Sequence, residues 1–364
     1  MKYSIRTKWF FSILFVLLAA CNLKPAPATP LATLPAQTVQ TPVVTQAATS
    51  SALPSLTPSL LPDPTETPVP ALAVLLALEG SDPTQVAAIQ AGLKDALAEA
   101  GLRWETRTTL TGQEAGLRLV IILPPDPGAA NLAASAPQVQ FLAVGLKGLT
   151  PTANLSLVGA QGERLDQIGF TAGYLAAMIT PDWRVGALAV SDNLAGKLAR
   201  QGFWNGAVYF CGLCLAYHGP TGDYPVYVEL PASATPGEWQ AAAQQLIDKT
   251  VRTVYITPGA GDETSLDLLL KSGAIFIGSQ PIPDALRSRW AATVVSDPLP
   301  AIQKLLPDLL TGKGGGSLPM PVSILEVNSN LVSPGRLLLA EKMLDNLLAG
   351  LIDTGLDPLT GEPH

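Results

Sequence analysis

Short apolar runs alternate with amphipathic helical patterns from residue 71 to the end of the chain. Residues 72–78 form a continuous apolar run bounded by Glu79-Gly80, which is typical of a buried parallel strand. Residues 84–99 follow with a helical period, and one face carries Val86, Ile89, Leu93 and Leu97. The repetition of this strand-and-helix unit predicts a doubly wound α/β architecture.

The same patterns recur along the rest of the chain. Strands are expected at residues 119–123, 139–144, 155–158, 185–190, 226–230, 253–256, 274–277, 291–295 and 322–327. Helices are expected at residues 163–179, 194–209, 238–249, 265–271 and 301–310, and in the last part of the chain after Ser333-Pro334. In that last helix, Leu338, Met343, Leu347 and Leu351 are expected to face the core, and Gly350 to end it.

Two sets of alternating elements predict two lobes. The first lobe is expected to contain residues 71–181 plus 281–315, and the second residues 182–280 plus 316–364, with crossings near Pro181-Asp182, Gln280-Pro281 and residues 314–316. Several crossings make a hinge, and a hinge between two lobes indicates closure on a ligand.

The N-terminus carries a targeting pattern. Lys2, Arg6 and Lys8 precede an apolar run that is too short to span a bilayer, and Leu18-Ala19-Ala20-Cys21 follows. This pattern resembles a bacterial lipobox, so we expect residues 1–20 to be a lipoprotein signal peptide and Cys21 to be the lipidated first residue. An ordinary signal peptide or a membrane anchor with a chance cysteine is the alternative. Lipidation would place the protein on the extracytoplasmic face of a bacterial cell membrane.

Residues 21–70 contain the lipidated cysteine and a segment rich in Pro, Thr and Ala. Eleven of the 33 prolines fall in this segment, and it has no apolar period. Such a composition cannot offset its ordering entropy, so we expect a disordered linker that reaches on the order of 40 Å. A tether with a functional length and a tail of no particular length both fit the composition.

Composition narrows the function classes. Only 14% of the chain is charged and 48% is hydrophobic, which favours a large buried core. The net charge of -7 and the lack of a basic patch argue against nucleic acid as a partner. Two histidines, with neither a nucleophile elbow nor a zinc-protease motif, give weak support for an enzyme, and we expect no cofactor and no metal site.

Polar residues follow the expected strands. Because open α/β lobes bind ligands at the carboxyl ends of their strands, we expect the loops there to form a solute site. The candidate ligand-binding residues are Asp82, Asp192, Asn193, Gly259, Gly261, Asp262, Ser279, Gln280 and Asp297. The Asp and Asn side chains can instead cap the helices that follow, and for any one of them both roles fit the sequence.

Cys211 and Cys214 form a closely spaced pair. In an extracytoplasmic protein such a pair predicts a small structural disulfide. A redox centre is the alternative, but the pair follows a predicted helix and therefore lacks a helix N-terminus to lower a thiol pKa. Metal binding would need two more ligands, and only His218 is near.

The helical segment from Asp166 to Met178 (DQIGFTAGYLAAM) carries a family resemblance, which continues at Arg184-Val185-Gly186-Ala187 and at residues 202–207 (GFWNGA). These segments, with residues 254–261 (VYITPGAG), resemble the basic membrane protein family, the PnrA-like nucleoside-binding lipoproteins of ABC importers. The resemblance covers essentially the whole globular part. It implies a type I periplasmic-binding-protein fold, a nucleoside-like ligand between the lobes and an ABC permease as partner.

The expected ligand residues depart from the family pattern. Residues 81–86 lack the family's aromatic residue, Ser279-Gln280 stands where the family has an aspartate, and Ser296-Asp297 stands where it has a lysine. Phe170, Phe203 and Trp204 lie on helical patterns that favour core packing, so Trp239 or Trp290 could supply the aromatic instead. The resemblance therefore implies the location of the site more than its ligand.

Three functions fit the sequence. A lipid-anchored solute-binding protein that delivers a small polar ligand to an ABC permease is the first. A lipoprotein of the same fold that senses a ligand and signals through a partner is the second. An extracytoplasmic thiol enzyme is the third, and it requires a reactive cysteine at position 211 or 214.

Overall fold

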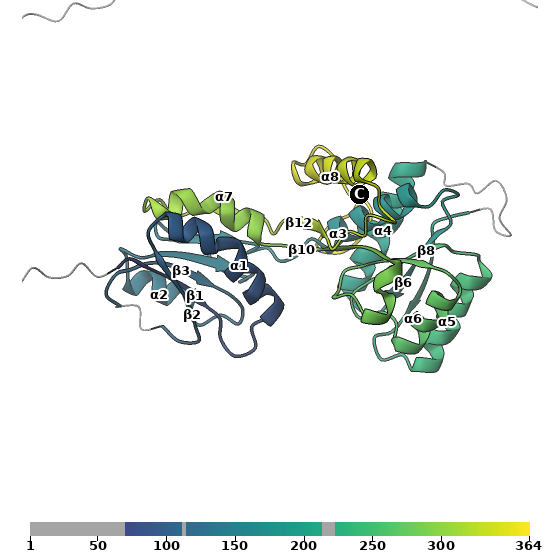
Figure 1. Ribbon diagram of the computed structural model, residues 1–364, viewed down its shortest axis with the longest axis horizontal. Coiled ribbons are helices and arrows are strands. Elements are labelled where there is room, and N and C mark those ends of the chain that lie inside the picture. Colours follow the sequence, from purple (N-terminus) through teal and green to yellow (C-terminus); the bar gives the residue numbers. More distant parts are fainter. Residues whose placement is uncertain (1–69, 111–113, 213–222) are drawn as a thin grey trace, which may run out of the picture. The chain divides into compact units, whose positions relative to one another are not determined.

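The computed structural model describes residues 70–110, 114–212 and 223–364. The expected signal peptide, Cys21, the linker up to Val69 and Cys214 lie outside these described residues. Within them, the strands form two mostly parallel sheets that carry helices on both faces (Figure 1). The doubly wound α/β class predicted from the sequence is confirmed. No helix in the described ranges is both long and apolar enough to cross a membrane.

The first sheet has the strand order β11-β5-β4-β3-β1-β2. Its strands are β1 (Leu72–Leu76), β2 (Arg103–Arg107), β3 (Leu117–Ile122), β4 (Gln140–Val144), β5 (Leu155–Val158) and β11 (Ser317–Leu318). All of its neighbouring strands pair in parallel. Helices α1 (Pro83–Glu99) and α7 (Leu299–Leu310) pack on one face, and α2 (Ala129–Ser135) packs on the other. We call this sheet with its three helices the first lobe.

The second sheet has the strand order β12-β10-β9-β8-β6-β7. Its strands are β6 (Val185–Val190), β7 (Val226–Leu230), β8 (Thr253–Ile256), β9 (Ile275–Gly278), β10 (Trp290–Ser296) and β12 (Val322–Leu325). Only β12 runs antiparallel to its neighbour, β10. This sheet and its helices form the second lobe.

Two helical layers cover the second sheet. Helices α3 (Leu165–Ile179), α4 (Leu194–Cys211) and α8 (Pro334–Leu348) share one apolar core with it. Helices α5 (Pro236–Asp248) and α6 (Glu263–Lys271), with the short 3-10 helix η1 (Asp284–Arg289), cover the opposite face. Continuous apolar strands such as β6 and β8 are buried because both of their faces are covered.

Helices α3 and α4 pack backbone against backbone at four glycines. Gly169 and Gly173 of α3 face backbone carbonyls of Ala199 and Phe203, and a Cβ atom at either glycine would overlap those atoms. Gly202 and Gly206 of α4 face the carbonyls of Asp166 and Phe170 in the same way. The two Gly-x-x-x-Gly spacings therefore form one interlocked seam, which explains why these residue types stand at these positions.

The chain passes between the two sheets at other points than the sequence predicts. Helix α3 was expected in the first lobe, but it packs on the second sheet against α4 and β10. Strand β10 also belongs to the second sheet, and β11 to the first. The passages accordingly lie at residues 159–164, 297–298 and 319–321. Sequence periodicity could not place α3, because a helix after β5 can pack on either sheet.

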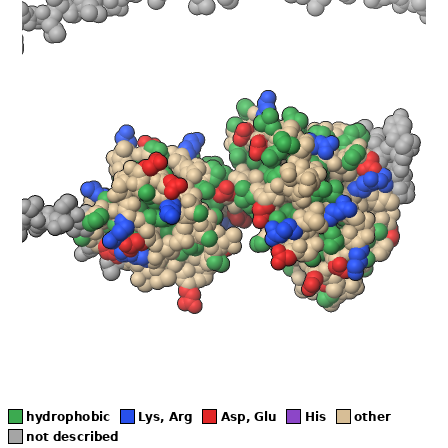
Figure 2. Space-filling view, viewed as in Figure 1, with side chains coloured by type: hydrophobic (Ala, Val, Ile, Leu, Met, Phe, Trp, Pro, Cys, Tyr) green, Lys and Arg blue, Asp and Glu red, His purple; other side chains and the backbone are tan. Residues whose placement is uncertain are grey.

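Four described elements were not expected from the sequence: η1 and three others. Strand β2 is an edge strand of mostly charged residues, α2 has only two buried side chains, and β11 has two residues. Met343 and Leu347 of α8 are buried as expected, but Leu338 of α8 is 66% exposed, and Leu351, which follows the helix, is 76% exposed. Figure 2 shows apolar side chains gathered where Figure 1 places this helix.

Candidate functional site

Four adjacent strands of the second sheet have a residue with a hydroxyl side chain as their last residue or directly after it. Side chains of a strand alternate between the two faces, and Ala187, Tyr255, Ile277 and Val294 all lie in the core cluster under α3 and α4. Counting on by two or four residues along β6, β8, β9 and β10 reaches four hydroxyls on that same face. We call these four residues the hydroxyl row: Ser191, Thr257, Ser279 and Ser296.

The members of the hydroxyl row differ in exposure. Ser191 is exposed and Ser279 is half-buried, so both can meet a solute directly. Thr257 is fully buried, and its Oγ1 has no hydrogen-bond partner among the described residues. The Oγ atom of Ser296 is buried and equally without a partner in the described ranges. Buried polar atoms nearly always have a partner in folded proteins, so a bound solute or a water molecule can complete the hydrogen bonding of these two hydroxyls.

Tyr255 forms a hydrogen bond with one member of the hydroxyl row, Ser279. Its phenol OH and the Oγ of Ser279 form a hydrogen bond of 2.7 Å. Its ring stacks on Phe203 of α4 with a centroid distance of 5.4 Å and an interplanar angle of 13°. Burial raises the pKa of Tyr255 far above its ordinary value, and the hydrogen bond from Ser279 opposes only part of that rise. The phenol therefore stays neutral and keeps the Ser279 hydroxyl oriented.

Three of the expected ligand residues cap helices. The carboxylate of Asp82 accepts a hydrogen bond of 2.8 Å from the backbone N–H of Thr84 at the start of α1. Asn193 Oδ1 accepts one of 2.7 Å from Gly196 N–H in α4. Asp262 forms a reciprocal capping box with Ser265 in α6. The structure thus assigns to these residues the capping role that the sequence left open.

The pKa of Asp262 is lowered. Its partial burial would raise the pKa, but hydrogen bonds from Ser265 and Thr264 to the carboxylate outweigh that penalty. Asp262 therefore stays ionised at neutral pH at the N-terminus of α6, where negative charge is favourable.

Asp192 and Asp297 each connect neighbouring segments of the chain through hydrogen bonds to their carboxylates. Both carboxylate oxygens of Asp192 lie 3.2 Å from the backbone N–H of Ala232, which joins the loop after β6 to the loop after β7. Asp297 Oδ1 accepts a hydrogen bond of 3.0 Å from Leu299 N–H, and Oδ2 accepts one of 3.1 Å from Ser323 Oγ in β12. Asp297 therefore fixes the point where the chain leaves the second sheet for α7.

The glycines after β8 shape the loop beside Thr257. Residues 257–260 form a turn closed by a hydrogen bond of 3.0 Å from Ala260 N–H to Thr257 O. Gly259 and Gly261 have φ angles of +77° and +78°, which side-chain-bearing residues rarely adopt. Pro258 before Gly259 fits the first central position of such a turn. Gln280, the last expected residue of this edge, is half-buried.

The structure brings Asp192 and Asn193 into one pocket with residues that the sequence analysis did not select. The pocket has a volume of about 430 Å³ and lies at the carboxyl ends of β6 and β7; its lining residues are Ser191, Asp192, Asn193, Leu194, Lys197, Arg200 and Glu229. It therefore continues the hydroxyl row at Ser191. Lys197 and Arg200 stand one turn apart directly after the Asn193 cap, a spacing that could have identified them.

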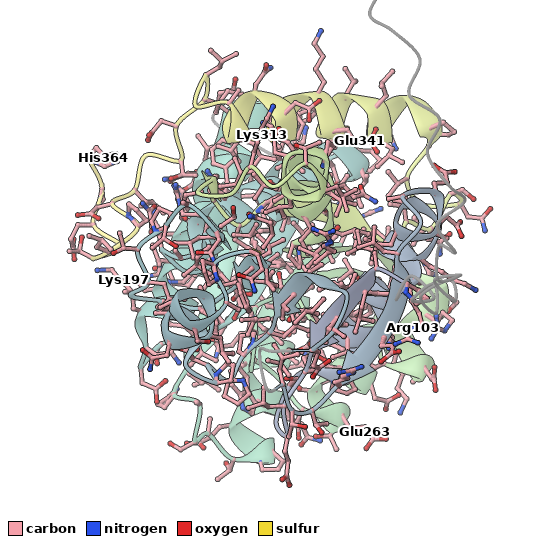
Figure 3. All side chains as sticks on the ribbon, turned by 90° about the vertical axis from the view of Figure 1, so that its left-hand side faces the viewer. Arg103, Lys197, Glu263, Lys313, Glu341 and His364 are labelled. Carbon is pink, nitrogen blue, oxygen red and sulfur yellow. The ribbon has the colours of Figure 1, made fainter. Side chains whose placement is uncertain are left out.

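The basic residues of this pocket are held in ion pairs. Arg200 Nε lies 2.8 Å from Glu229, and its guanidinium carbon lies 4.4 Å from the ring centre of Tyr227. Lys197 Nζ lies 2.5 Å from Glu362 and 3.3 Å from Thr360 O, so the segment that ends at His364 lies beside the pocket (Figure 3). Both cations of the pocket are therefore already paired with carboxylates.

The aromatic residues considered for stacking lie in the core. Phe170, Phe203, Trp239 and Trp290 are at most 3% exposed. Trp204 is half-buried and contacts Tyr227 edge-on at 6.1 Å. The expectation that Trp239 or Trp290 could stack on a base is therefore wrong, since both side chains are buried in the core between the second sheet and its α5, α6 and η1 layer.

Of the expected cysteine pair, Cys211 is disulfide-bonded. The partner predicted from the spacing, Cys214, lies outside the described residues, so the pairing stays a prediction. Within the described residues, no group of three or more His, Cys, Asp or Glu side chains could hold a metal ion.

Comparison with solved structures shows the fold. An ABC transporter solute-binding protein from Conexibacter woesei is 18% identical, with a TM-score of 0.55, and the match covers 78% of this chain and 98% of that one. A solute-binding protein from Aeropyrum pernix is 15% identical over 80% of this chain and 84% of its own, with a TM-score of 0.44. The chain has the type I periplasmic-binding-protein fold. No family model matches the chain, and no curated protein matches it.

The fold class relates the position of the hydroxyl row to the place where proteins of this architecture bind ligands. Ligands of open α/β lobes bind at the carboxyl ends of the strands, which is the edge where the row and the pocket lie. Asp82 belongs to the corresponding edge of the first sheet, where Ser81 Oγ donates a hydrogen bond of 2.6 Å to Pro124 O. The membership in the basic membrane protein family implied by the sequence remains a prediction.

Proposed function

We propose that this protein is the extracytoplasmic solute-binding component of an ABC importer, anchored to the membrane through Cys21. It captures a small polar ligand between its lobes and presents it to a permease. The hydroxyl row carries this proposal, because it places two accessible and two buried hydroxyls at the ligand-binding edge of a type I fold. The passages of the chain between the sheets provide the hinge that such capture requires.

The chemistry of the edge favours a neutral solute that carries hydroxyl groups. Serine and threonine hydroxyls both donate and accept, so a row of them matches a row of ligand hydroxyls. The nearby carboxylates of Asp192, Asp262 and Asp297 repel anions. Nucleosides lead the candidates through the family resemblance, and the row would then contact the ribose rather than the base.

Transport is proposed ahead of sensing and of enzymatic activity. A solved structure of the same fold, with a TM-score of 0.55, is named as an ABC transporter solute-binding protein. The disulfide at Cys211 removes the free thiol that the enzyme hypothesis needs at that position.

A thermal-shift screen of the full chain in mild detergent tests the proposal. The panel contains nucleosides, nucleobases, pentoses, hexoses, polyols and amino acids. A ligand at a hundred times its dissociation constant stabilises the folded state by about 2.7 kcal/mol, which is readily measured. We expect stabilisation by at least one hydroxylated solute. A well-folded protein that responds to no member of the panel, or only to amino acids, contradicts the proposal.

A further inference from the structure

A second pocket lies at the opposite edge of the second sheet. Its volume is about 480 Å³, and it is lined where β6, β8 and β9 begin and where α3, α5 and α6 end. In parallel strands the amino and carboxyl ends lie at opposite edges, so this pocket is separate from the hydroxyl row. Nothing in the proposed capture of a solute uses it.

Three arginines line this pocket, and each comes directly before a strand of the same sheet. Arg184 precedes β6, Arg252 precedes β8 and Arg289 precedes β10. Since β6, β8 and β10 run in the same direction, the three residues arrive at one edge from three separate segments. Together they make a cationic pocket in a chain whose net charge is -7.

Within the described residues, a single carboxylate pairs with these guanidinium groups. Asp182 lies 2.5 Å from Arg184 Nη2 and 3.4 Å from Arg252 Nε. Arg184 is further fixed by a hydrogen bond of 3.2 Å from its Nη1 to Thr250 Oγ1. Arg289 is exposed and has no ion pair in the described part of the chain. Two of the three positive charges are therefore available to a ligand.

Strained backbone conformations occur at the arginine pocket. Only three described residues other than glycine have a positive φ angle. One of them, Thr250 (+56°), lines this pocket, and a second, Trp183 (+54°), is the chain neighbour of the lining residue Arg184. Trp183 directly precedes Arg184, and Thr250 holds its side chain. A bulky residue such as tryptophan adopts this conformation at an energetic cost, and such strain is typically kept where it positions functional groups.

We propose that the arginine pocket binds a phosphate group. Guanidinium groups match phosphate oxygens with paired N–H donors, and three of them from different directions suit a tetrahedral anion. The phosphate has two possible sources, free inorganic phosphate and the headgroup of an anionic lipid.

The arginines also lie near the carboxyl ends of α3, α5 and α6, whose partial negative charge they complement. A purely structural role of that kind predicts that replacing an arginine changes stability and nothing else. Measurement of binding therefore separates the two roles.

The test is a calorimetric titration of inorganic phosphate into the full chain at low ionic strength. We expect saturable binding of one phosphate per chain, weakened at least tenfold by Arg252→Gln and by Arg289→Gln and abolished in the double variant. Both residues are exposed, so the variants should fold, which circular dichroism checks. Arg336→Gln removes the same charge from an exposed position on α8 and should bind as the parent does.

Sedimentation with vesicles distinguishes the sources. Arginine-dependent binding to phosphatidylglycerol vesicles and none to phosphatidylcholine, in protein with Cys21→Ala to remove the anchor, assigns the site to a lipid headgroup. Arginine-dependent binding of free phosphate alone assigns it to the inorganic anion. The proposal is overturned if the folded protein binds neither, or if binding persists unchanged in the double variant.

Discussion

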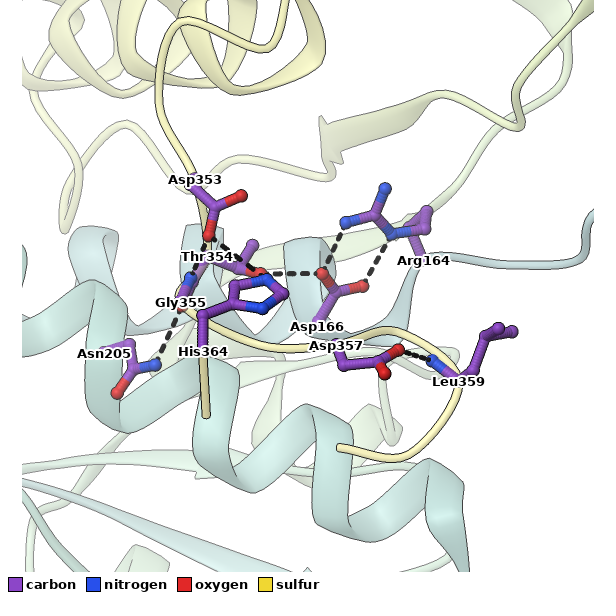
Figure 4. Close-up of polar contacts among 9 residues, drawn as sticks. All are labelled: Arg164, Asp166, Asn205, Asp353, Thr354, Gly355, Asp357, Leu359 and His364. Atoms are coloured by element: carbon purple, nitrogen blue, oxygen red, sulfur yellow. Dashed lines mark hydrogen bonds and ion pairs between the residues drawn. The ribbon is translucent and has the colours of Figure 1, made fainter. Parts of the chain in front are cut away.

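Asp166 in the first turn of α3 accepts a hydrogen bond of 2.8 Å from the Oγ1 of Thr354, although 188 residues separate them. Asp166 is fully buried, and Arg164 donates two further hydrogen bonds of 2.9 and 2.6 Å to its carboxylate (Figure 4). Asn205 of α4 donates one of 2.8 Å to the carbonyl of Thr354. One buried carboxylate thus joins the passage from the first sheet, the α3–α4 pair and the last segment of the chain.

Replacing Asp166 should therefore destabilise the second lobe. Asp166→Ala leaves the Arg164 guanidinium and the Thr354 hydroxyl without their partner, and breaking a buried pair costs about 3 kcal/mol, less here because Arg164 is partly exposed. Urea denaturation measures the loss. Asp284→Ala removes an exposed carboxylate that pairs with Arg287 and should change stability by less than about 1 kcal/mol. Equal effects of the two variants would contradict this account.

The glycine seam between α3 and α4 predicts an unusual response to alanine. Alanine normally stabilises a helix relative to glycine by about 0.5–1 kcal/mol. Gly173→Ala and Gly206→Ala should instead destabilise by about 3 kcal/mol, because the new Cβ meets backbone atoms of the partner helix that cannot move independently. Gly237→Ala in α5 is the control, since its Cβ meets no atom within 4 Å. Seam variants as stable as the parent would show that the helices are not in contact.

The lowered pKa of Asp262 predicts a pH-dependent contribution to stability. A group whose pKa is lower in the folded state stabilises it above the pKa of the unfolded chain, about 3.9, and loses that contribution as the pH falls through the folded-state pKa. Asp262→Asn should therefore be less stable than the parent at pH 7, and the difference should shrink as the pH falls below about 4. Denaturation curves across this range measure it. A difference independent of pH would mean that the charge contributes nothing.

Membrane attachment should depend on one cysteine. Cys21→Ala is expected to abolish both incorporation of labelled fatty acid and recovery in the membrane fraction, because lipidation needs the Cys21 thiol. Cys211→Ala should leave both unchanged. Membrane recovery of the Cys21→Ala protein at the parental level would mean that an uncleaved apolar segment holds it instead.

Sequence periodicity was sufficient for the buried parts of the fold. The apolar runs of β1, β6 and β8 are covered on both faces, so composition alone distinguishes them, and α1 buries Ile89, Leu93 and Leu97 on the predicted face. Strand β2 was missed because an edge strand can carry charged residues such as Arg103 and Glu105. The sequence analysis placed α3 in the wrong lobe. Its place in the second lobe follows from the glycine seam with α4, and that contact joins residues about thirty positions apart in the sequence, which local periodicity does not reveal.

The candidate site was predicted only in part for a related reason. Sequence alone located the loops after the strands, but several of their Asp and Asn residues are used as caps. The hydroxyl row appears only when the register of four strands is known, because Thr257 and Ser296 are neighbours of the site through the sheet and not through the chain. Likewise Glu229 reaches the pocket from β7 and Lys197 from α4.

The most direct test of the proposed function compares solute binding with and without the accessible part of the hydroxyl row. Thermal stabilisation and calorimetric titration with the best solute of the panel are measured on the parent, on Ser191→Ala with Ser279→Ala, and on Ser135→Ala with Ser288→Ala as a control that removes two exposed hydroxyls elsewhere. The account predicts at least tenfold weaker binding by the first double variant and parental binding by the control. Equal binding by all three proteins would show that the solute binds elsewhere.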